Sequence, residues 1–170
     1  MARFDVRPAA ADDATAVRRV ARESWHAAYD DLLGAETVDA VVDEWYDPQH
    51  LARSIEREDG VFPVAEGGEP PDSEVVGFAQ GVLGDGDDPA ELPRIYVRPD
   101  RWGEGAGSAL LSRVEAWLTD RGAERLRLVV LADNEVGNRF YETHRYDVVD
   151  ERESELAGRT VSEYVREKQL

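Results

Sequence analysis

The sequence predicts a single α/β domain, residues 1–170, built on a mixed sheet. Segments with strand periodicity alternate with segments of helical periodicity in the order β-α-α-β-β-β-α-β-α-β-β, which is typical of this class. The chain has 170 residues, of which 42% are hydrophobic, so it can bury one core without disulfides. We therefore expect a central sheet of about seven strands flanked by about four helices.

The first half of the chain is predicted to contain one long helix between short strands. FDVRP at 4–8 has strand alternation, and Asp12 or Asp13 can cap a helix whose apolar residues follow helical spacing. Residues 32–58 are less regular and break at Pro48, which predicts two short helices. Two further strands surround the turn-rich GGEPPDS, namely VFPVAE at 61–66 and EVVGFAQGVL at 74–83.

The second half contains the glycine-rich stretch RPDRWGEGAG between a strand and a helix. The strand is RIYVR at 94–98, and Pro93 before it indicates a bulged start. RLRLVVL at 125–131 changes from alternating to continuous apolar residues, as a strand buried on both faces does. A helix at 134–144 and two terminal strands follow, near 146–151 and 158–167.

Composition excludes several kinds of site. The chain has no cysteine, so disulfides, thiolate–metal sites and cysteine nucleophiles are excluded. His26, His50 and His144 lack metal-ligand spacing, so no metal site is expected. The first twenty residues contain no signal-peptide core, and the longest apolar run, LVVLA at 128–132, is far shorter than a membrane span. We therefore expect a cytoplasmic protein without a membrane partner.

The chain is strongly acidic. It has 37 Asp and Glu against 20 Lys and Arg, a formal net charge of -17, and Lys168 is the only lysine. Self-repulsion among carboxylates opposes folding, and molar salt shortens the Debye length to about 3 Å and screens it. We interpret the acidic surface as halophilic, an adaptation to a salt-rich cytoplasm. Because such a surface repels phosphate, nucleic acid is not an expected partner.

The glycines between strand and helix suggest a phosphate cradle. A helix N-terminus offers unpaired N–H groups and a positive dipole end, and Gly103, Gly105 and Gly107 lack the Cβ atoms that would keep a ligand away. A dinucleotide fingerprint is excluded because its third glycine position holds Ser108 or Leu110, and a P-loop is excluded because no lysine follows the glycines. An ordinary glycine-rich turn is the alternative.

A second motif lies in the helix at 134–144. Asn134 and Tyr141 are two helical turns apart, so both project on one face. Gly137 inside the helix costs about 1 kcal/mol relative to alanine. Clearance for a ligand would explain this glycine, and a tight helix–strand contact is the alternative. Tyr141 is accordingly either a functional residue or a core residue.

These two motifs together resemble the GNAT superfamily of acyl-CoA-dependent N-acetyltransferases. Its signature, Arg/Gln-x-x-Gly-x-Gly/Ala at a strand-to-helix turn, is matched by Gly105 and Gly107. Trp102 occupies the Arg/Gln position, with Arg101 beside it. The resemblance covers nearly the whole chain, including the preceding IYVRP and the later N-x-x-small-x-x-F-Y-E, although Arg-Tyr replaces the usual Gly-Phe after the last of these helices.

The resemblance implies a GNAT-like fold and acetyl-CoA as co-substrate. Backbone N–H groups of the glycine loop would bind the CoA pyrophosphate, Asn134 would bind the pantetheine arm, and Tyr141 would lie beside the thioester sulfur. The cofactor-binding residues that we expect are Ile95, Tyr96, Val97, Gly103, Glu104, Gly105, Ala106, Gly107, Ser108, Asn134 and Tyr141.

The reaction implied is direct transfer of an acetyl group to an amine within one complex. A backbone N–H of the strand at 94–98 is suited to polarise the carbonyl group, and Tyr141 is the expected proton donor to the thiolate. The expected base is Glu91, at the start of the fourth strand, where several family members carry a glutamate. His26 is the alternative base.

The acceptor is left open as a small-molecule or peptide amine, and a homodimer is compatible with the sequence. Four aromatic residues either line an acceptor pocket or pack in the core, namely Trp25, Tyr29, Trp45 and Tyr46. The alternative to an enzyme is a CoA-binding regulatory or sensor module of the same fold. A phosphate-binding enzyme of another class is disfavoured by the missing lysine and the missing fingerprint.

Overall fold

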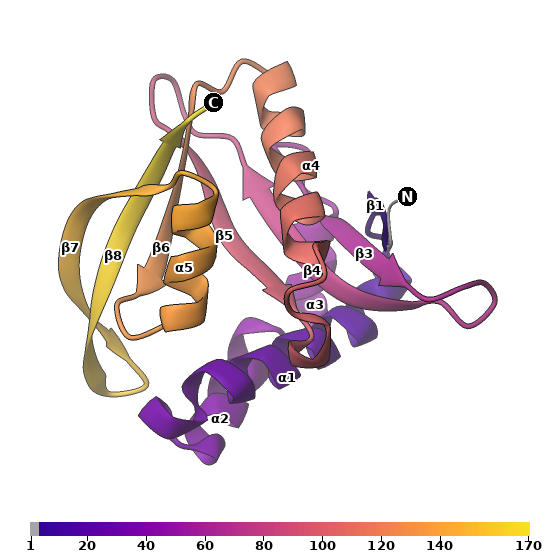
Figure 1. The fold of residues 1–170 in the computed structure, drawn as a ribbon, viewed down its shortest axis with the longest axis horizontal. Coiled ribbons are helices and arrows are strands. Elements are labelled where there is room, and N and C mark those ends of the chain that lie inside the picture. The colour runs from indigo at the N-terminus through magenta and orange to yellow at the C-terminus, as the bar shows by residue number, and fades with distance from the viewer. Residues whose placement is uncertain (1–3) are drawn as a thin grey trace.

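The computed structural model of the chain describes residues 4–170. Its strands form one mixed sheet of eight in the order β1-β3-β4-β5-β6-β8-β7, with β2 paired to β4 (Figure 1). The strands are β1 (Phe4–Pro8), β2 (Gly60–Val61), β3 (Pro63–Gly67), β4 (Glu74–Val82), β5 (Ala90–Val97), β6 (Arg125–Leu131), β7 (Asp147–Leu156) and β8 (Arg159–Gln169). The helices are α1 (Ala14–Leu33), α2 (Ala35–Trp45), α3 (Pro48–Ile55), α4 (Ala106–Asp120) and α5 (Glu135–Thr143).

The α/β class is confirmed, with one strand and one helix more than expected. The segment at 61–66 divides at the buried Phe62 into β2 and β3, because β2 pairs only with β4 whereas β3 also pairs with β1. The irregular region contains α2 and α3, which are separated at the expected break before Pro48.

Two predicted element boundaries need correction. Asp13 precedes α1 but makes no side-chain cap, because its carboxylate binds Arg7 and the backbone N–H of Ala10 instead. The strand expected at 94–98 begins earlier, at Ala90, and its register against β4 shifts near Pro93. The irregularity indicated by that proline is therefore present, but it lies within β5.

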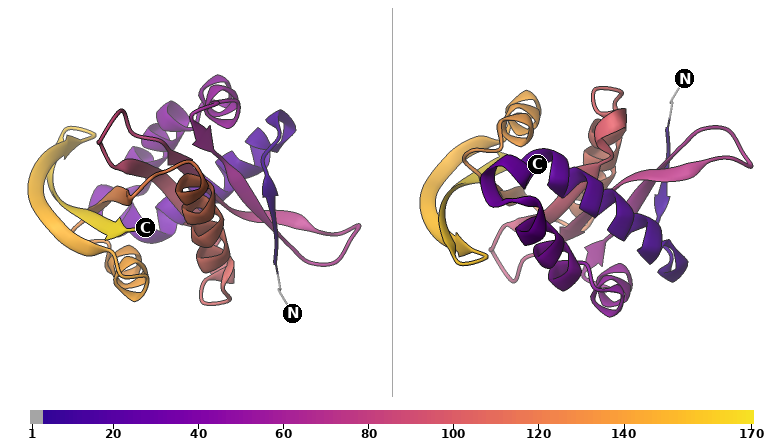
Figure 2. Two further views of the ribbon diagram at one scale, coloured as in Figure 1. Left: turned by 90° about the horizontal axis from the view of Figure 1, so that it is seen from above. Right: turned by 90° about the horizontal axis from the view of Figure 1, so that it is seen from below.

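Helices cover both faces of the sheet, as the views in Figure 2 show. α1, α2 and α3 belong to a buried cluster that includes Trp25 and Phe78, whereas α4 packs in a second cluster that includes Leu110 and Leu128. The packed side chains of α5 also contact this second cluster. The two faces are therefore called the α1 face and the α4 face.

The sheet opens in its centre, between β5 and β6. These parallel strands pair at only two positions, Ala90 with Leu126 and Glu91 with Arg127. Beyond Glu91, β5 stays paired with β4 and β6 stays paired with β8, so the two halves of the sheet diverge (Figure 1). We call this gap the β5–β6 opening. It lies at the carboxyl ends of two parallel strands, where ligands bind in many α/β proteins.

Candidate functional site

The glycine loop leads from the carboxyl end of β5 into α4. Gly103 and Gly105 have φ angles of 78° and 99°, which only glycine adopts without strain, and an added Cβ at either would meet no atom within 4 Å. Gly105 is the N-cap of α4, and no side chain caps the helix. The first N–H groups of α4, from Ala106 to Ser108, have no partner within the helix. This arrangement fits an anionic group such as a pyrophosphate.

A glycine is required at position 107 for a different structural reason. A Cβ there would lie 3.0 Å from the ring of Phe140, so the glycine lets α4 and α5 approach closely. At the next residue of α4, the Ser108 hydroxyl and His144 Nε2 are hydrogen-bonded at 3.0 Å. These contacts fix the first turn of α4 against α5.

The side chains around the Arg/Gln position of the motif are held by the protein itself. The indole N–H of Trp102 donates to the Val97 carbonyl at 2.8 Å, while 40% of the residue stays exposed. Arg101 donates to Glu104 at 3.1 Å and lies over the ring of Phe4. These contacts hold the loop in place, and the space beside Gly103 and Gly105 stays open.

One edge of β5 faces the β5–β6 opening. The N–H of Arg98 donates to Val76 on β4 at 2.8 Å. Because backbone groups of successive strand residues point to opposite edges, the N–H groups of Val97 and Ile95 point toward the opening. The backbone of Tyr96 faces β4, and its ring packs in the cluster on the α1 face. Val97 and Ile95 thus carry the donors that can reach a ligand in the opening.

Asn134 is the N-cap of α5 rather than its first residue. Its Oδ1 accepts the Gly137 N–H at 2.9 Å, and its Nδ2 donates to the Tyr29 hydroxyl at 2.9 Å, which joins α5 to α1. A Cβ on Gly137 would lie 2.6 Å from the Asn134 amide nitrogen. The capping side chain therefore explains this glycine, instead of the ligand clearance or helix–strand contact considered from the sequence.

Two polar residues that the motifs do not include fix α5 in place. Arg166 of β8 is only 3% exposed and donates to the Asn138 side chain at 3.0 Å and to the Tyr146 carbonyl at 2.7 Å. Asn138 in turn donates to the backbone carbonyls of Leu131 and Asn134. No local pattern marks Arg166, because it is buried by strands and a helix that are distant in sequence.

Four tyrosines from different elements lie close enough to interact electrostatically. Burial raises the pKa of Tyr141 well above its ordinary value, and Tyr29 and Tyr46 affect it electrostatically. Burial also raises the pKa of Tyr29 to about 12. Burial is also the main cause of the raised pKa of Tyr96. Electrostatic interactions with Tyr46, Tyr29 and Tyr141 raise this pKa further. These phenols therefore remain protonated at neutral pH.

The four aromatic residues considered for an acceptor pocket are only partly buried together. Trp25 lies 4.7 Å from Tyr29 and 5.4 Å from Trp45, measured between ring centroids. Trp25, Tyr29 and Tyr46 are buried in the cluster on the α1 face, whereas Trp45 is 44% exposed. Packing accounts for the first three, although the Tyr29 hydroxyl reaches Asn134 at the opening.

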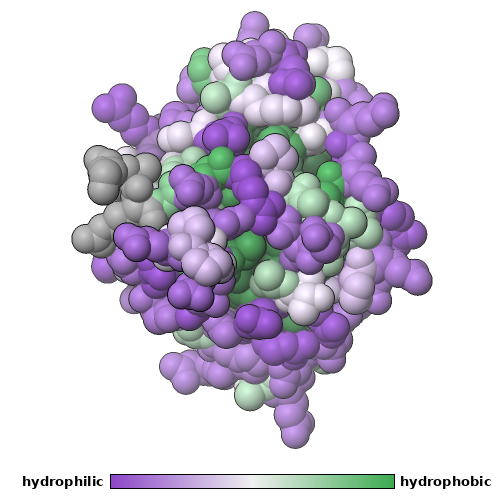
Figure 3. All heavy atoms as spheres, turned by 90° about the vertical axis from the view of Figure 1, so that its right-hand side faces the viewer, coloured by the Kyte–Doolittle hydropathy of each residue, from purple (hydrophilic) through white to green (hydrophobic). Residues whose placement is uncertain are grey.

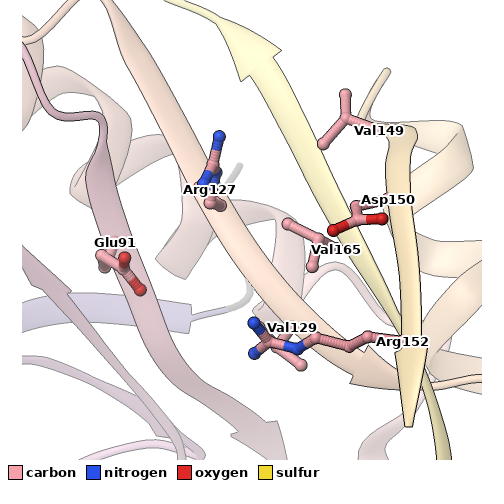
Figure 4. A pocket seen from close by; sticks show the side chains of 7 residues that line it. All are labelled: Glu91, Arg127, Val129, Val149, Asp150, Arg152 and Val165. Atoms are coloured by element: carbon pink, nitrogen blue, oxygen red, sulfur yellow. The ribbon is translucent and has the colours of Figure 1, made fainter.

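A hollow of about 350 Å³ lies at the closed end of the opening (Figure 4). Alternation along β6 places Val129 on the α1 face, since Leu128 and Val130 belong to the cluster with α4. The exposed Glu91, the last residue of β5 paired with β6, also lines the hollow. Its lining residues are Glu91, Arg127, Val129, Val149, Asp150, Arg152 and Val165.

The two candidate bases differ in their surroundings. No hydrogen bond or ion pair holds Glu91 within residues 4–170. His26 binds Asp30 at 2.6 Å and Asp39 at 2.9 Å, and these hydrogen bonds, that of Asp30 first, raise its pKa above the ordinary value. Two carboxylates that raise the pKa of His26 favour its charged form, which cannot accept a proton, so the geometry favours Glu91.

Among residues 4–170, no group of three or more potential ligands is arranged to hold a metal ion. In the same range, no helix is long and apolar enough to cross a membrane.

The chain resembles acetyltransferases by sequence. The model of the acetyltransferase (GNAT) family matches residues 18–145. The spermidine N(1)-acetyltransferase of Thermoplasma acidophilum is 28% identical over 148 residues, which cover 86% of this chain and 90% of the relative. An N-acetyltransferase of Mycobacterium tuberculosis is 33% identical over 99 residues, which cover 58% of this chain and 63% of the relative.

Solved structures agree with this assignment. PaiA N-acetyltransferase from Thermoplasma acidophilum, in complex with coenzyme A, superposes with a TM-score of 0.83 and 26% identity, covering 98% of this chain and 99% of that chain. An acetyltransferase of Salmonella typhimurium with acetyl-CoA gives a TM-score of 0.66 at 18% identity, over 98% of this chain and 94% of that chain, which shows the fold alone. The chain belongs to the GNAT family of N-acetyltransferases, which use acetyl-CoA as the acetyl donor.

Proposed function

We propose that the enzyme transfers the acetyl group directly to a primary amine of an aliphatic polyamine, with the two substrates meeting in the β5–β6 opening. The observation that carries this proposal is the opening itself. It connects the glycine loop and α5 on the α4 face with Glu91 and the hollow on the α1 face. Donor and acceptor can therefore approach from opposite faces without competing for space.

The donor side is formed by backbone groups. The free N–H groups at the start of α4 would hold the pyrophosphate, and the open space beside Gly103 and Gly105 leaves room for it. The N–H groups of Val97 and Ile95 would orient the pantetheine arm and the thioester carbonyl, as pre-placed donors in a water-poor site do. Asn134 already uses both side-chain groups within the protein, so its contribution is to align α5.

Tyr141 is proposed to supply a proton to the departing thiolate. No described residue forms a hydrogen bond to its hydroxyl, which leaves the proton available. Its raised pKa keeps the phenol protonated but also makes it a weaker acid than a thiol, whose ordinary pKa is about 8.5. Tyr141 would therefore act mainly by donating a hydrogen bond to the charge that develops on sulfur in the transition state, and the phenol would recover from solvent any proton that it passes to the thiolate.

Glu91 is proposed to accept the amine proton, directly or through water. An aliphatic ammonium has a pKa of about 10.4 and must lose a proton before it can attack. Glu91 is unpaired, exposed and located where β5 and β6 separate, so an amine in the hollow can reach it. His26 is committed to Asp30 and Asp39 and is not proposed for this step.

Two observations support a polyamine as the acceptor. A relative with 28% identity is named for spermidine, and a net charge of -17 attracts polycations over long range. The test is CoA thiol release from acetyl-CoA with spermidine, 1,4-diaminobutane, an aminoglycoside and a peptide with a free N-terminus. Release with the two polyamines is expected. Release with the peptide alone would show that the acceptor class is wrong.

A further inference from the structure

We infer that Asp150 on β7 binds a second ammonium group of the acceptor, at the side of the hollow opposite Glu91, and so selects long polyamines over simple amines. This inference rests on the proposed function, because it assigns an acceptor subsite. It adds a specificity-determining residue that lies three strands away from the reacting amine. The hollow therefore selects the acceptor by its length as well as by its charge.

Strand register places Glu91 and Asp150 at opposite ends of one surface. Glu91 pairs with Arg127 on β6, and two residues further along β6, Val129 pairs with Val165 on β8. Val165 pairs with Asp150 on β7, and all these residues line the hollow (Figure 4). The register of β7 shifts just before Asp150, and bulges of this kind redirect side chains.

The span suits a triamine. Three strand spacings of about 4.8 Å, together with an offset of two residues (about 7 Å) along β6, separate the backbones of Glu91 and Asp150 by about 16 Å. The two side chains shorten the gap between the carboxylates. Spermidine has nine bonds of about 1.5 Å between its terminal nitrogens, which project to roughly 11 Å in a staggered chain. A monoamine bound at Glu91 cannot reach Asp150.

The centre of the hollow is apolar. Val129 of β6 and Val165 of β8 pair directly across the two strands, and Val149 of β7 lies beside them. Val129 is 39% exposed, whereas Val165 is buried. Methylene groups between two ammonium groups would cover the exposed Val129 and Val149 and remove their surface from water. Carboxylates at two ends with aliphatic side chains between them match the alternation of charge and hydrocarbon in a polyamine.

The arginines of the hollow are already paired, and the two carboxylates are not. Arg127 donates to Glu167 at 2.9 Å, and the same glutamate also binds Arg125 at 3.1 Å. Arg152 has one long ion pair, 3.7 Å to Glu163. Glu91 has no cationic partner within residues 4–170, and Asp150 accepts only the N–H of Glu151 there. Uncompensated negative charge therefore remains at both ends of the hollow, on Glu91 and on Asp150.

Arg152 is the more weakly paired of the two arginines that line the hollow, and its charge opposes a polycation. Its guanidinium extends from β7 over the hollow toward Val129 (Figure 4), and its side chain is 53% exposed. Held by a single long ion pair, it can turn toward solvent when an ammonium group enters. Removing its charge should therefore strengthen acceptor binding, whereas removing the charge of Asp150 should weaken it. A purely structural role for this strand would not produce opposite signs.

The test compares kcat/KM for spermidine and n-butylamine in the parent, Asp150→Asn and Arg152→Gln proteins. Glu151→Gln is the matched control, since Glu151 is adjacent but pairs with Tyr164, whose ring packs on the α4 face. A charge-assisted contact makes spermidine about tenfold better than butylamine in the parent and the control. Asp150→Asn should abolish this preference through KM, and Arg152→Gln should increase it.

Further substrates separate this inference from the proposed function. 8-Aminooctanoate carries a carboxylate where 1,8-diaminooctane, with nine bonds between its nitrogens as in spermidine, carries an ammonium, and it should be the poorer acceptor. The inference is overturned if 8-aminooctanoate is preferred, or if Asp150→Asn keeps the preference for spermidine while amines are acetylated. If no amine is acetylated, the proposed function fails, and calorimetry with spermidine on the CoA-loaded protein decides the inference. Binding weakened by Asp150→Asn alone supports it, and absence of binding overturns it.

Discussion

Tyr141 is the residue whose surroundings in the structure bear most directly on the proposed chemistry. Burial raises its pKa, and its hydroxyl has no partner among the described residues. Its ring packs edge-on against Phe140 and Tyr146. The position of the phenol is therefore set by the packing of the ring, and the hydroxyl is left for a ligand.

Tyr141→Phe should lower kcat while leaving acetyl-CoA binding close to that of the parent. The substitution removes one oxygen and keeps the packing of the ring, and general-acid assistance is typically worth about 10²–10⁴-fold. Steady-state kinetics and calorimetric titration with acetyl-CoA measure the two effects. Tyr164→Phe, on β8, is the control and should keep its kcat. An acid role is wrong if the Tyr141 variant keeps its kcat within about threefold when chemistry limits the rate.

At the scale of the elements, the loop before α4 could be predicted from the sequence because its chemistry is local. Three glycines between a strand and a helix indicate an anion cradle wherever the chain folds. The individual roles could not be predicted, because they depend on contacts. Gly105 is required by its φ angle, Gly107 by the nearby Phe140, and Gly137 by the Asn134 side chain.

The acceptor side could be predicted much less well. Glu91 was expected at the start of its strand, and the structure locates it where β5 leaves β6. Asp150 and Arg152 lie in a strand of alternating charges that looks like an ordinary solvated surface. Their place in the hollow depends on the register of β5, β6, β8 and β7, which long-range pairing fixes.

Gly105→Ala should weaken acetyl-CoA binding by about tenfold, because a Cβ would enter the space left for the pyrophosphate. Gly122→Ala is the matched control. Gly122 has a φ of 90°, also meets nothing within 4 Å, and follows the opposite end of α4. Both variants should lose similar stability in thermal unfolding, since both strain the backbone. Equal losses of affinity in the two, measured by calorimetry, would mean that the loop only turns the chain.

The pair of helices α1 and α2 should respond to pH through His26. Its hydrogen bonds to Asp30 and Asp39 raise its folded pKa above the ordinary value of about 6.5. The stability it provides is therefore fully present below that pH and is lost as pH rises through the folded pKa. The melting-temperature difference between parent and His26→Gln should be largest near pH 6 and shrink toward about pH 9. His50→Gln, at an exposed site on α3, should show no such trend; a gap that widens with pH contradicts the assignment.

At the scale of the whole molecule, charge remains the dominant feature. With 37 acidic and 20 basic residues, 17 negative charges stay unneutralised even if every Lys and Arg charge is balanced by one carboxylate. Hydrophilic side chains cover most of the face shown in Figure 3, with hydrophobic ones visible between them. Adaptation to a salt-rich cytoplasm stays a prediction, since neither the fold nor the relatives bear on it.

Raising KCl from about 0.1 M to about 2 M should raise the melting temperature, because screening weakens repulsion among the unpaired carboxylates. The ion pairs on the surface lose strength in the same salt, but exposed pairs contribute only about 0–1 kcal/mol each. Repulsion among the carboxylates should therefore decide whether the melting temperature rises or falls with KCl. Scanning calorimetry measures the midpoint of thermal unfolding. A midpoint that stays constant or falls as KCl rises is incompatible with salt adaptation.

The central claim is that donor and acceptor meet in the β5–β6 opening, each from its own face of the sheet. Calorimetric titration with spermidine joined covalently to CoA tests it most directly, because one molecule must then occupy both sides at once. Since the second contact becomes intramolecular, the conjugate should bind at least about 10²-fold more tightly than CoA. Asp150→Asn should remove part of this gain, Gly105→Ala should weaken the conjugate and CoA alike, and Glu151→Gln should change neither. A conjugate that binds no more tightly than CoA would contradict the claim.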